Sequence, residues 1–182
     1  MNLIKKRKPR DYILYTVIIA VGIILDQITK WLAVENLQKL NTLPLIEDVL
    51  HLTYVENRGA AFGMFADSRW IFILISAVAI VGFALYLYFG HATNNIYAVA
   101  ISLVVSGGIG NMIDRLALGY VVDFIDCRFV KYPVFGESGV YFNTFPVFNG
   151  ADSFVCVGAG LLMLALILEM IAESKAARAK KK

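Results

Sequence analysis

Two aspartates, Asp123 and Asp152, each lie where a polar segment of the sequence meets an apolar one. Two neighbouring carboxyl groups cannot easily both ionise, so they share a proton. One can then act as a base on water, while the other donates a proton to the carbonyl or the leaving amine of a substrate. The two aspartates are therefore candidates for hydrolysing a peptide bond.

Each aspartate also has a purely structural interpretation. Asp152 begins an apolar stretch, where an aspartate commonly caps a helix or interacts with its dipole. Asp123 could be a loop residue paired with Arg115. Both interpretations stay open when each position is considered alone.

The elements that must position these aspartates are apolar stretches. The chain is 59% hydrophobic and has a mean hydropathy of +0.68, which is more apolar than a typical soluble domain. A helix needs roughly 20 mostly apolar residues to cross a hydrocarbon core of about 30 Å. Four stretches qualify, at about 12–34, 69–89, 96–118 and 151–172. We predict a single all-α integral membrane domain, residues 1–182, with four transmembrane helices.

The placement of basic residues predicts the orientation. They cluster in the two tails, 1–11 and 173–182, and clusters of Lys and Arg mark cytoplasmic flanks. Both termini should therefore be cytoplasmic, and loops 35–68 and 119–150 should face outward. Residues 51–55 and 139–142 are rich in strand formers, so we expect a small extracytoplasmic cap with short strands. Most of the basic residues lie in the tails, which does not favour a nucleic-acid partner.

Polar residues from several elements are expected at one depth. At about 1.5 Å per residue, Asp26 lies roughly 20 Å along the first helix, with Lys30 one turn higher. The residues expected near this outer boundary are Asp26, Lys30, Asn111, Asp114, Arg115, Asp123, Asn149 and Asp152. Lys30 and Asp26 alone could be an i,i+4 pair or snorkel to the interface, and Arg115 could pair with Asp114 or a loop carboxylate. A shared polar site accounts better for the whole group, because charged groups inside a bilayer are costly.

Other catalytic chemistries have little support. His91 is expected on the cytoplasmic side, and no base is expected at the depth of Ser102 or Ser106. The chain has no His-Glu-x-x-His motif, and its two cysteines, Cys127 and Cys156, are too few for a zinc site. We expect neither a metal nor a cofactor, while Mg²⁺ at the carboxylate cluster stays open as an alternative at this point.

Five local motifs resemble those of one known family. They are Asp26-Gln-Ile-Thr-Lys30, Asn57-Arg-Gly-Ala-Ala-Phe-Gly63, Gly108-Ile-Gly-Asn-Met-Ile-Asp-Arg115, Val121-Val-Asp-Phe124 and Phe145-Pro-Val-Phe-Asn-Gly-Ala-Asp152. In this order and on this four-span layout, they resemble the bacterial lipoprotein signal peptidase (signal peptidase II) family. The resemblance covers nearly the whole chain.

The resemblance implies an aspartyl protease of the bacterial inner membrane with its site at the outer face. Asp123 and Asp152 match the catalytic pair of the family. The positions that match residues shaping the site or holding substrate are Asp26, Asn57, Asn111, Arg115 and Asn149. Lys30, Gly59 and Asp114, in the same motifs, complete our candidate site.

The implied partners follow from the same family. The substrate is a prolipoprotein whose lipobox cysteine carries diacylglyceryl, and the peptide bond just before that cysteine is cleaved. Membrane lipid is the second expected partner. Globomycin-type inhibitors block the pair of aspartates. No cofactor, metal or nucleic acid is implied. One departure is the segment between Asp123 and Asp152, which is longer than expected for the family and is expected to form an extra hairpin or a flap over the site.

Two other classes of function were weighed. A small transporter or channel subunit would use the polar cluster as an ion path, but such a path should continue through the cytoplasmic half, where ionisable residues are scarce. A scaffold protein would bind a partner through its outer cap. Substitution of either aspartate would then weaken binding of the partner, and it would cause no loss of bond cleavage.

Overall fold

The computed structural model describes residues 8–59, 69–89, 95–129, 131–136 and 139–179. Within these residues the chain forms four helices and five strands. The helices are α1 (Pro9–Leu37), α2 (Arg69–Tyr88), α3 (Asn95–Ala117) and α4 (Gly150–Ala179). The strands are β1 (Thr42–Ile46), β2 (Leu50–Asn57), β3 (Val121–Cys127), β4 (Lys131–Gly136) and β5 (Gly139–Thr144).

The helices are apolar on their outer faces, as in a membrane protein. Large side chains such as Trp31, Ile75 and Met170 are at least 60% exposed, which suits contact with lipid better than contact with water. Among the described residues, α1, α3 and α4 are long and apolar enough to cross a membrane. The apolar part of α2, Ile73–Tyr88, is shorter. The prediction of a mostly helical, multi-pass membrane protein is confirmed to this extent.

Two helices run further than the apolar stretches that predicted them. Helix α1 continues to Leu37, and α4 continues to Ala179. The added residues of α4 include Glu, Lys, Ala and Arg, which favour helix without favouring lipid. These ends therefore extend the helices as polar turns beyond the apolar spans.

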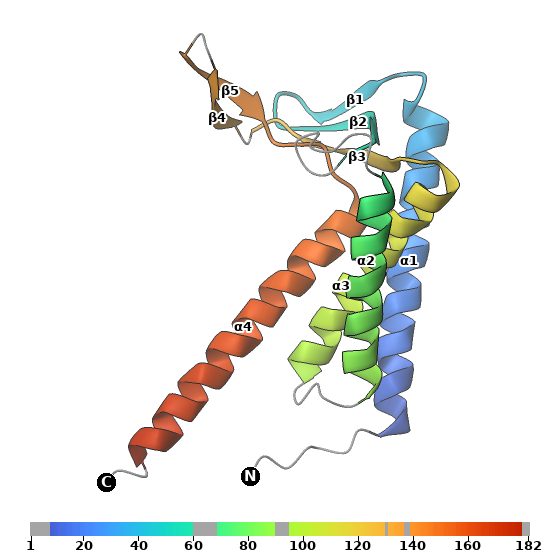
Figure 1. Cartoon of the computed structure of the whole chain (residues 1–182). Helices are drawn as coiled ribbons and strands as arrows, with labels where there is room; N and C mark the ends of the chain where they lie inside the picture. The colour runs from blue at the N-terminus through green and yellow to red at the C-terminus, as the bar shows by residue number, and fades with distance from the viewer. Residues whose placement is uncertain (1–7, 60–68, 90–94, 130, 137–138, 180–182) are drawn as a thin grey trace.

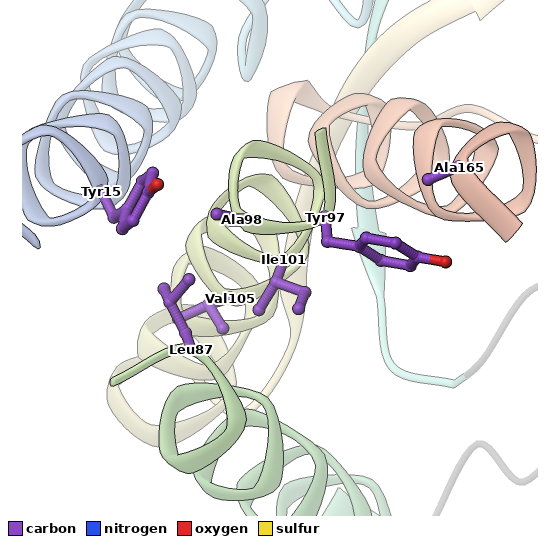
Figure 2. Packing of buried hydrophobic residues seen from close by; sticks show 7 residues of the cluster. All are labelled: Tyr15, Leu87, Tyr97, Ala98, Ile101, Val105 and Ala165. Atoms are coloured by element: carbon purple, nitrogen blue, oxygen red, sulfur yellow. The ribbon is translucent and has the colours of Figure 1, made fainter. Parts of the chain in front are cut away.

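Helix α3 lies at the centre of the helices and packs against the other three. Figure 2 shows part of this core, where Ile101 and Val105 of α3 lie near Leu87 of α2, and Ala165 of α4 lies on the side of Tyr97. Close packing of α3 on α4 depends on glycine. A Cβ atom on Gly158 would meet the carbonyl oxygen of Ala100 at 2.6 Å, so any larger residue would push the two helices apart.

A three-stranded antiparallel sheet, in the order β1-β2-β3, crosses one end of the helices (Figure 1). Ala33 and Leu37 of α1 pack with Val122 of β3 in a second apolar cluster, which fixes the sheet on the end of α1. The ends of α1 and α4 that are remote from the sheet lie at the opposite end of the molecule. The strand predicted at 51–55 is confirmed as β2.

Strands β4 and β5 form a separate antiparallel hairpin between the two candidate catalytic aspartates in sequence. The predicted strand at 139–142 is confirmed as β5, and of the two forms predicted for this segment, a hairpin or a flap over the site, the strands form a hairpin. The hairpin projects beyond the three-stranded sheet on the side of α4 (Figure 1). At its base, Ile125 and Phe148 form an isolated antiparallel bridge that returns the chain to β3 before α4 begins.

Candidate active site

Asp123 lies in the middle of β3 with only 1% of its surface exposed. Both of its carboxylate oxygens accept hydrogen bonds from side-chain amides. Asn57, at the end of β2, donates to Oδ2 at 2.8 Å. Asn149, just before α4, donates to Oδ1 at 2.6 Å. The antiparallel pairing of β2 with β3 brings the first of these amides to the aspartate from a distant part of the sequence.

Asp152 lies in the first turn of α4. Its Oδ1 accepts a 2.7 Å hydrogen bond from the amide of Asn111 in α3, and its Oδ2 accepts one of 3.2 Å from the backbone N–H of Asn149. In return, Oδ1 of Asn149 accepts the backbone N–H of Asp152 at 2.9 Å. This reciprocal pair is a capping box at the N-terminus of α4. The structural interpretation of Asp152 as a helix-capping residue is therefore correct, and the same residue faces the polar cluster.

The asparagine amides at this site are held in a defined orientation. Oδ1 of Asn57 accepts the backbone N–H of Gly59 at 3.1 Å, and Oδ1 of Asn111 accepts the ammonium of Lys30 at 2.9 Å. With its oxygen occupied by a donor, each amide turns its NH₂ group toward an aspartate. As a result, every carboxylate oxygen of Asp123 and Asp152 accepts at least one N–H donor.

The environment of Asp123 favours its protonated form. Burial raises its pKa from 3.8 to about 7, and the negative charge of Asp152 acts in the same direction. The amides of Asn57 and Asn149, and the charge of Lys30, oppose this rise because they stabilise the ionised form. Close to neutral pH, Asp123 can therefore hold or release a proton.

A buried ionic cluster lies beside the two aspartates. The ammonium of Lys30 is 2.9 Å from Oδ2 of Asp26 and 2.9 Å from Oδ2 of Asp114, and all three side chains are at most 4% exposed. The i,i+4 pair considered for Asp26 and Lys30 is confirmed. It is buried, so the alternative of simple snorkelling to the interface is wrong for Lys30.

The remaining predicted residues lie around the same cluster. Arg115 donates to the backbone carbonyl of Asn111 at 3.4 Å and is partly buried. Gly59 is buried at the end of β2, where its N–H bonds Asn57. Thus α1, α3, β2, β3 and the start of α4 bring every predicted site residue to one region of the molecule.

One residue of the cluster was not predicted. The amide of Gln27 donates to Asp114 at 3.0 Å, to Asp26 at 3.2 Å and to the carbonyl of Gly110 at 3.3 Å. Its position beside Asp26 inside an apolar span was a signal, because a polar amide there needs a partner.

An apolar groove lies further along the helices, away from the sheet. It has a volume of about 500 Å³ and lies between α2, α3 and α4. The described residues that line it are Ala79, Gly82, Phe83, Tyr86, Tyr97, Ile101 and Leu162. Along the groove α4 inclines away from α1 and α2 (Figure 1) but stays packed on α3, where Tyr97 bonds Glu169 of α4 at 2.7 Å.

Comparison with known proteins identifies the family of this chain. The sequence profile described as signal peptidase (SPase) II matches residues 18–168. This chain belongs to the signal peptidase II family. The lipoprotein signal peptidase of Halalkalibacterium halodurans is 38% identical over 154 residues, which cover 85% of this chain and 92% of that relative. The lipoprotein signal peptidase of Caldanaerobacter subterraneus subsp. tengcongensis is 44% identical over 154 residues, which cover 84% and 95%.

Solved structures of bacterial membrane enzymes share the fold. One, determined by the in meso method at 2.3 Å resolution, is 31% identical, with a TM-score of 0.72 over 86% of this chain and 89% of that one. Another, at 1.9 Å resolution, is also 31% identical, with a TM-score of 0.69 over 84% and 92%. The family predicted from the five motifs is confirmed, and with it a membrane peptidase.

Proposed function

We propose that this chain is an aspartic endopeptidase that removes signal peptides from prolipoproteins whose lipobox cysteine carries diacylglyceryl. It cleaves just before that cysteine. The observation that carries the proposal is the pair formed by Asp123 and Asp152, whose carboxylate oxygens all accept oriented N–H donors. Donors fixed in this way hold two acidic groups for proton transfer without further rearrangement.

The two aspartates take different roles in the first step. Asp152 is the base, because the amide of Asn111 and the N-terminus of α4 both favour its negative charge. It removes a proton from a water molecule, whose oxygen attacks the carbonyl carbon of the scissile bond. Asp123 is the acid and donates its proton to the carbonyl oxygen, which avoids the build-up of negative charge there.

The second step restores both groups. The tetrahedral intermediate collapses when Asp152 passes its new proton to the nitrogen of the leaving cysteine. Asp123 recovers a proton from one hydroxyl of the intermediate as the carbonyl re-forms. The signal peptide leaves with a new carboxyl group and the lipidated cysteine with a new amino group, so one water molecule is consumed in all.

The proposed topology has four helices in a bacterial inner membrane, with both termini cytoplasmic and the site at the outer face. The apolar part of α2, residues 73–88, is about 24 Å long at 1.5 Å per residue, which is close to the hydrocarbon thickness. Trp70 precedes it, and Trp is common at membrane interfaces. A lipidated substrate stays in the bilayer, so its scissile bond meets the site at this boundary.

The apolar groove between α2, α3 and α4 accommodates the apolar segment of the signal peptide in this proposal. A signal peptide has an apolar region of about 7–15 residues, which spans about 10–23 Å as a helix. The groove is lined by apolar and aromatic residues and opens between helices. Lipid surrounds the rest of the apolar surface. Globomycin-type inhibitors are expected to compete with substrate at Asp123 and Asp152, and nucleic acid has no role.

The test is cleavage of a purified prolipoprotein with a diacylglyceryl-modified lipobox cysteine, in detergent, by the parent and by Asp123→Asn and Asp152→Asn. Both folded variants should fall to background. A matched control is Asp126→Asn, because Asp126 is also buried on β3 but bonds Thr53 and Arg128 instead of the site. The control should keep most of its activity.

The outcomes separate the parts of the proposal. Cleavage by the parent that survives in one aspartate variant would show that the catalytic pair is wrong while the peptidase assignment stands. A folded parent that does not cleave the lipidated substrate would overturn the proposed function. Cleavage of the unmodified prolipoprotein at the same rate would overturn the requirement for diacylglyceryl.

A further inference from the structure

Lys30 is a fully buried cation that contacts three described side chains, each at 2.9 Å. They belong to Asp26 of α1 and to Asn111 and Asp114 of α3. Only 3% of the lysine side chain is exposed. A lysine is seldom buried so completely, because its charge must then be compensated by partners.

The first carboxylate connects Lys30 to the backbone next to Asp152. Oδ2 of Asp26 bonds the ammonium, while its Oδ1 accepts the backbone N–H of Ala151 at 2.8 Å. Ala151 immediately precedes Asp152. Helix α3 leaves room for this carboxylate through Gly110, since a Cβ atom there would collide with Oδ2 of Asp26.

The second carboxylate connects Lys30 to the backbone next to Asp123. Oδ2 of Asp114 bonds the ammonium and also accepts the backbone N–H of Val122 at 3.1 Å. Val122 immediately precedes Asp123. One ammonium group therefore joins two carboxylates, and each of these holds the residue before one of the paired aspartates.

The third contact reaches Asp152 through a side chain. The ammonium donates to Oδ1 of Asn111, which leaves the NH₂ group of this amide to donate to Asp152 at 2.7 Å. The same Oδ1 also accepts the amide of Asn149 at 3.1 Å, and Asn149 bonds Asp123. Both aspartates are thus linked to Lys30 through side chains as well as through the backbone.

We propose that Lys30 is a positioning residue that sets the separation and the hydrogen bonding of Asp123 and Asp152. The inference rests on the proposed function of these two aspartates. Without the ammonium, Asp26 and Asp114 would be two like charges bridged by the neutral amide of Gln27, and their repulsion would move them apart. They would carry the backbone at 151 and 122 with them, and Oδ1 of Asn111 would lose one of its two donors and keep the amide of Asn149.

The alternative is that Lys30 only stabilises the fold, and the two roles differ in what they change. A purely structural lysine would alter the melting temperature or the yield, while each folded molecule kept its rate and its pH profile. A positioning lysine would alter kcat in folded molecules and leave KM nearly unchanged. It would also alter the titration of Asp123, because burial raises the pKa of this carboxyl group and the charge of Lys30 opposes that rise.

The first experiment compares Lys30→Met with Arg128→Met. Methionine keeps most of the length of each side chain and removes its charge. Arg128 bonds the buried Asp126 at 3.0 Å in the cap, so this control removes a cation from a buried carboxylate that does not touch the site. We expect kcat of folded Lys30→Met to fall about 10²-fold, as for a misplacement of about 1 Å, with KM within about threefold. Arg128→Met should keep kcat.

A second variant covers the case in which Lys30→Met does not fold. Lys30→Met with Asp114→Asn removes one positive and one negative charge, so the net charge of the cluster is unchanged. Its kcat should also fall, since neither Asp26 nor Asn111 regains the ammonium. Parent-like kcat and pH profile in either folded variant would overturn the inference.

A measurement without substrate separates this inference from the proposed function. The carboxyl carbon of Asp123 can be followed by carbon-13 NMR across pH, with its signal assigned by its loss in Asp123→Asn. In folded Lys30→Met the midpoint of this titration should move to higher pH, whether or not the parent cleaves prolipoprotein. An unmoved midpoint would overturn the positioning role even if the peptidase assignment holds.

Discussion

The side-chain amide of Asn149 lies 2.6 Å from Oδ1 of Asp123, while the oxygen of the same amide receives the backbone N–H of Asp152. One asparagine therefore connects the two aspartates and also caps α4. Because its oxygen is already engaged, its NH₂ group points only toward acceptors. This arrangement makes the fold at the start of α4 and the proposed chemistry at Asp123 depend on the same side chain.

The two functions of Asn149 can be separated by substitution. Asn149→Ala should lower the melting temperature, because loss of a helix cap costs about 1 kcal/mol, and should reduce kcat by at least about tenfold. Asn149→Ser should restore most of the stability, since serine is also a good cap, without restoring kcat, since it has no amide to donate to Asp123. Thermal unfolding and steady-state kinetics measure the two effects. Equal recovery of both by serine would contradict the link to Asp123.

Cleavage should depend on pH through the proton on Asp123. With a pKa of about 7, this carboxyl group loses its proton as the pH rises through neutrality, so kcat/KM should fall on the alkaline side. The observed value belongs to the coupled pair, since Asp152 lies close enough to raise it. A pH profile of kcat/KM for the lipidated substrate tests this. A rate that stays constant up to pH 9 would contradict the role of Asp123 as the acid.

Asn57 should tune this profile. Its amide stabilises ionised Asp123, so Asn57→Ala should move the alkaline limb upward by about one pH unit. Thr42→Val is a suitable control, because Thr42 bonds Thr53 on the exposed side of the same sheet. The control should leave the profile in place. A downward shift in Asn57→Ala would mean that the amide does not favour the ionised form.

Stability should also depend on pH through Asp123, in the opposite sense to most carboxyl groups. Its pKa rises from 3.8 to about 7 on folding, so between these values the folded state holds a proton that the unfolded state has lost. Stability therefore falls as the pH rises through this window and is constant above it. Between pH 5 and pH 7 the free energy of unfolding should fall by about 2 kcal/mol because of this one group. Melting temperatures at pH 5 and pH 8 should differ less in Asp123→Asn than in the parent, and equal differences would contradict the buried proton.

The groove can be tested with two glycines. A Cβ atom on Gly82 or on Gly160 would meet no heavy atom of the described residues within 4 Å, so a larger residue fits at either position. Gly82 lines the groove, whereas Gly160 is outside the described lining. Gly82→Phe should raise KM for a full prolipoprotein about tenfold, equivalent to about 1.4 kcal/mol of binding, and Gly160→Phe should not.

A short lipidated lipobox peptide without the apolar signal segment provides the comparison for this groove. Its KM should be the same for the parent, Gly82→Phe and Gly160→Phe, because it does not reach the groove. If Gly82→Phe raised KM equally for the short peptide and the full prolipoprotein, the effect would come from the helices and not from the groove.

Much of the architecture could be predicted because membrane helices have a strong sequence signal. A run of about 20 apolar residues is diagnostic by itself, and counting along it gives the depth of each polar residue. This count placed Lys30 and Asn111 at a similar depth, and the ammonium of Lys30 lies 2.9 Å from Oδ1 of Asn111. The exact ends of α1 and α4 were missed, because a helix continues outside the bilayer wherever its residues favour it.

The cap and the details of the site were harder to predict. Strand β1 is short and contains Pro44, and β3 begins just after the third apolar stretch, where a polar loop was expected. Neither strand therefore has a clear alternating pattern. Contacts made by the backbone, such as those of Val122 and Ala151, are invisible to a search for reactive side chains. Orientation of the asparagine amides depends on partners from four different elements, which only the folded chain brings together.

The bridge between Ile125 and Phe148 has a consequence for how such an enzyme can change over evolutionary time. Three backbone hydrogen bonds of 2.8–3.1 Å join Phe148 to residues 124 and 125, so the chain is already closed upon itself before it reaches Asp152. The segment between Ile125 and Phe148, which includes the β4–β5 hairpin, is therefore a loop whose two ends are held together by these hydrogen bonds. Closing a longer loop costs little extra free energy, so its length and sequence can drift, or accept an inserted reporter domain, while both aspartates stay in place.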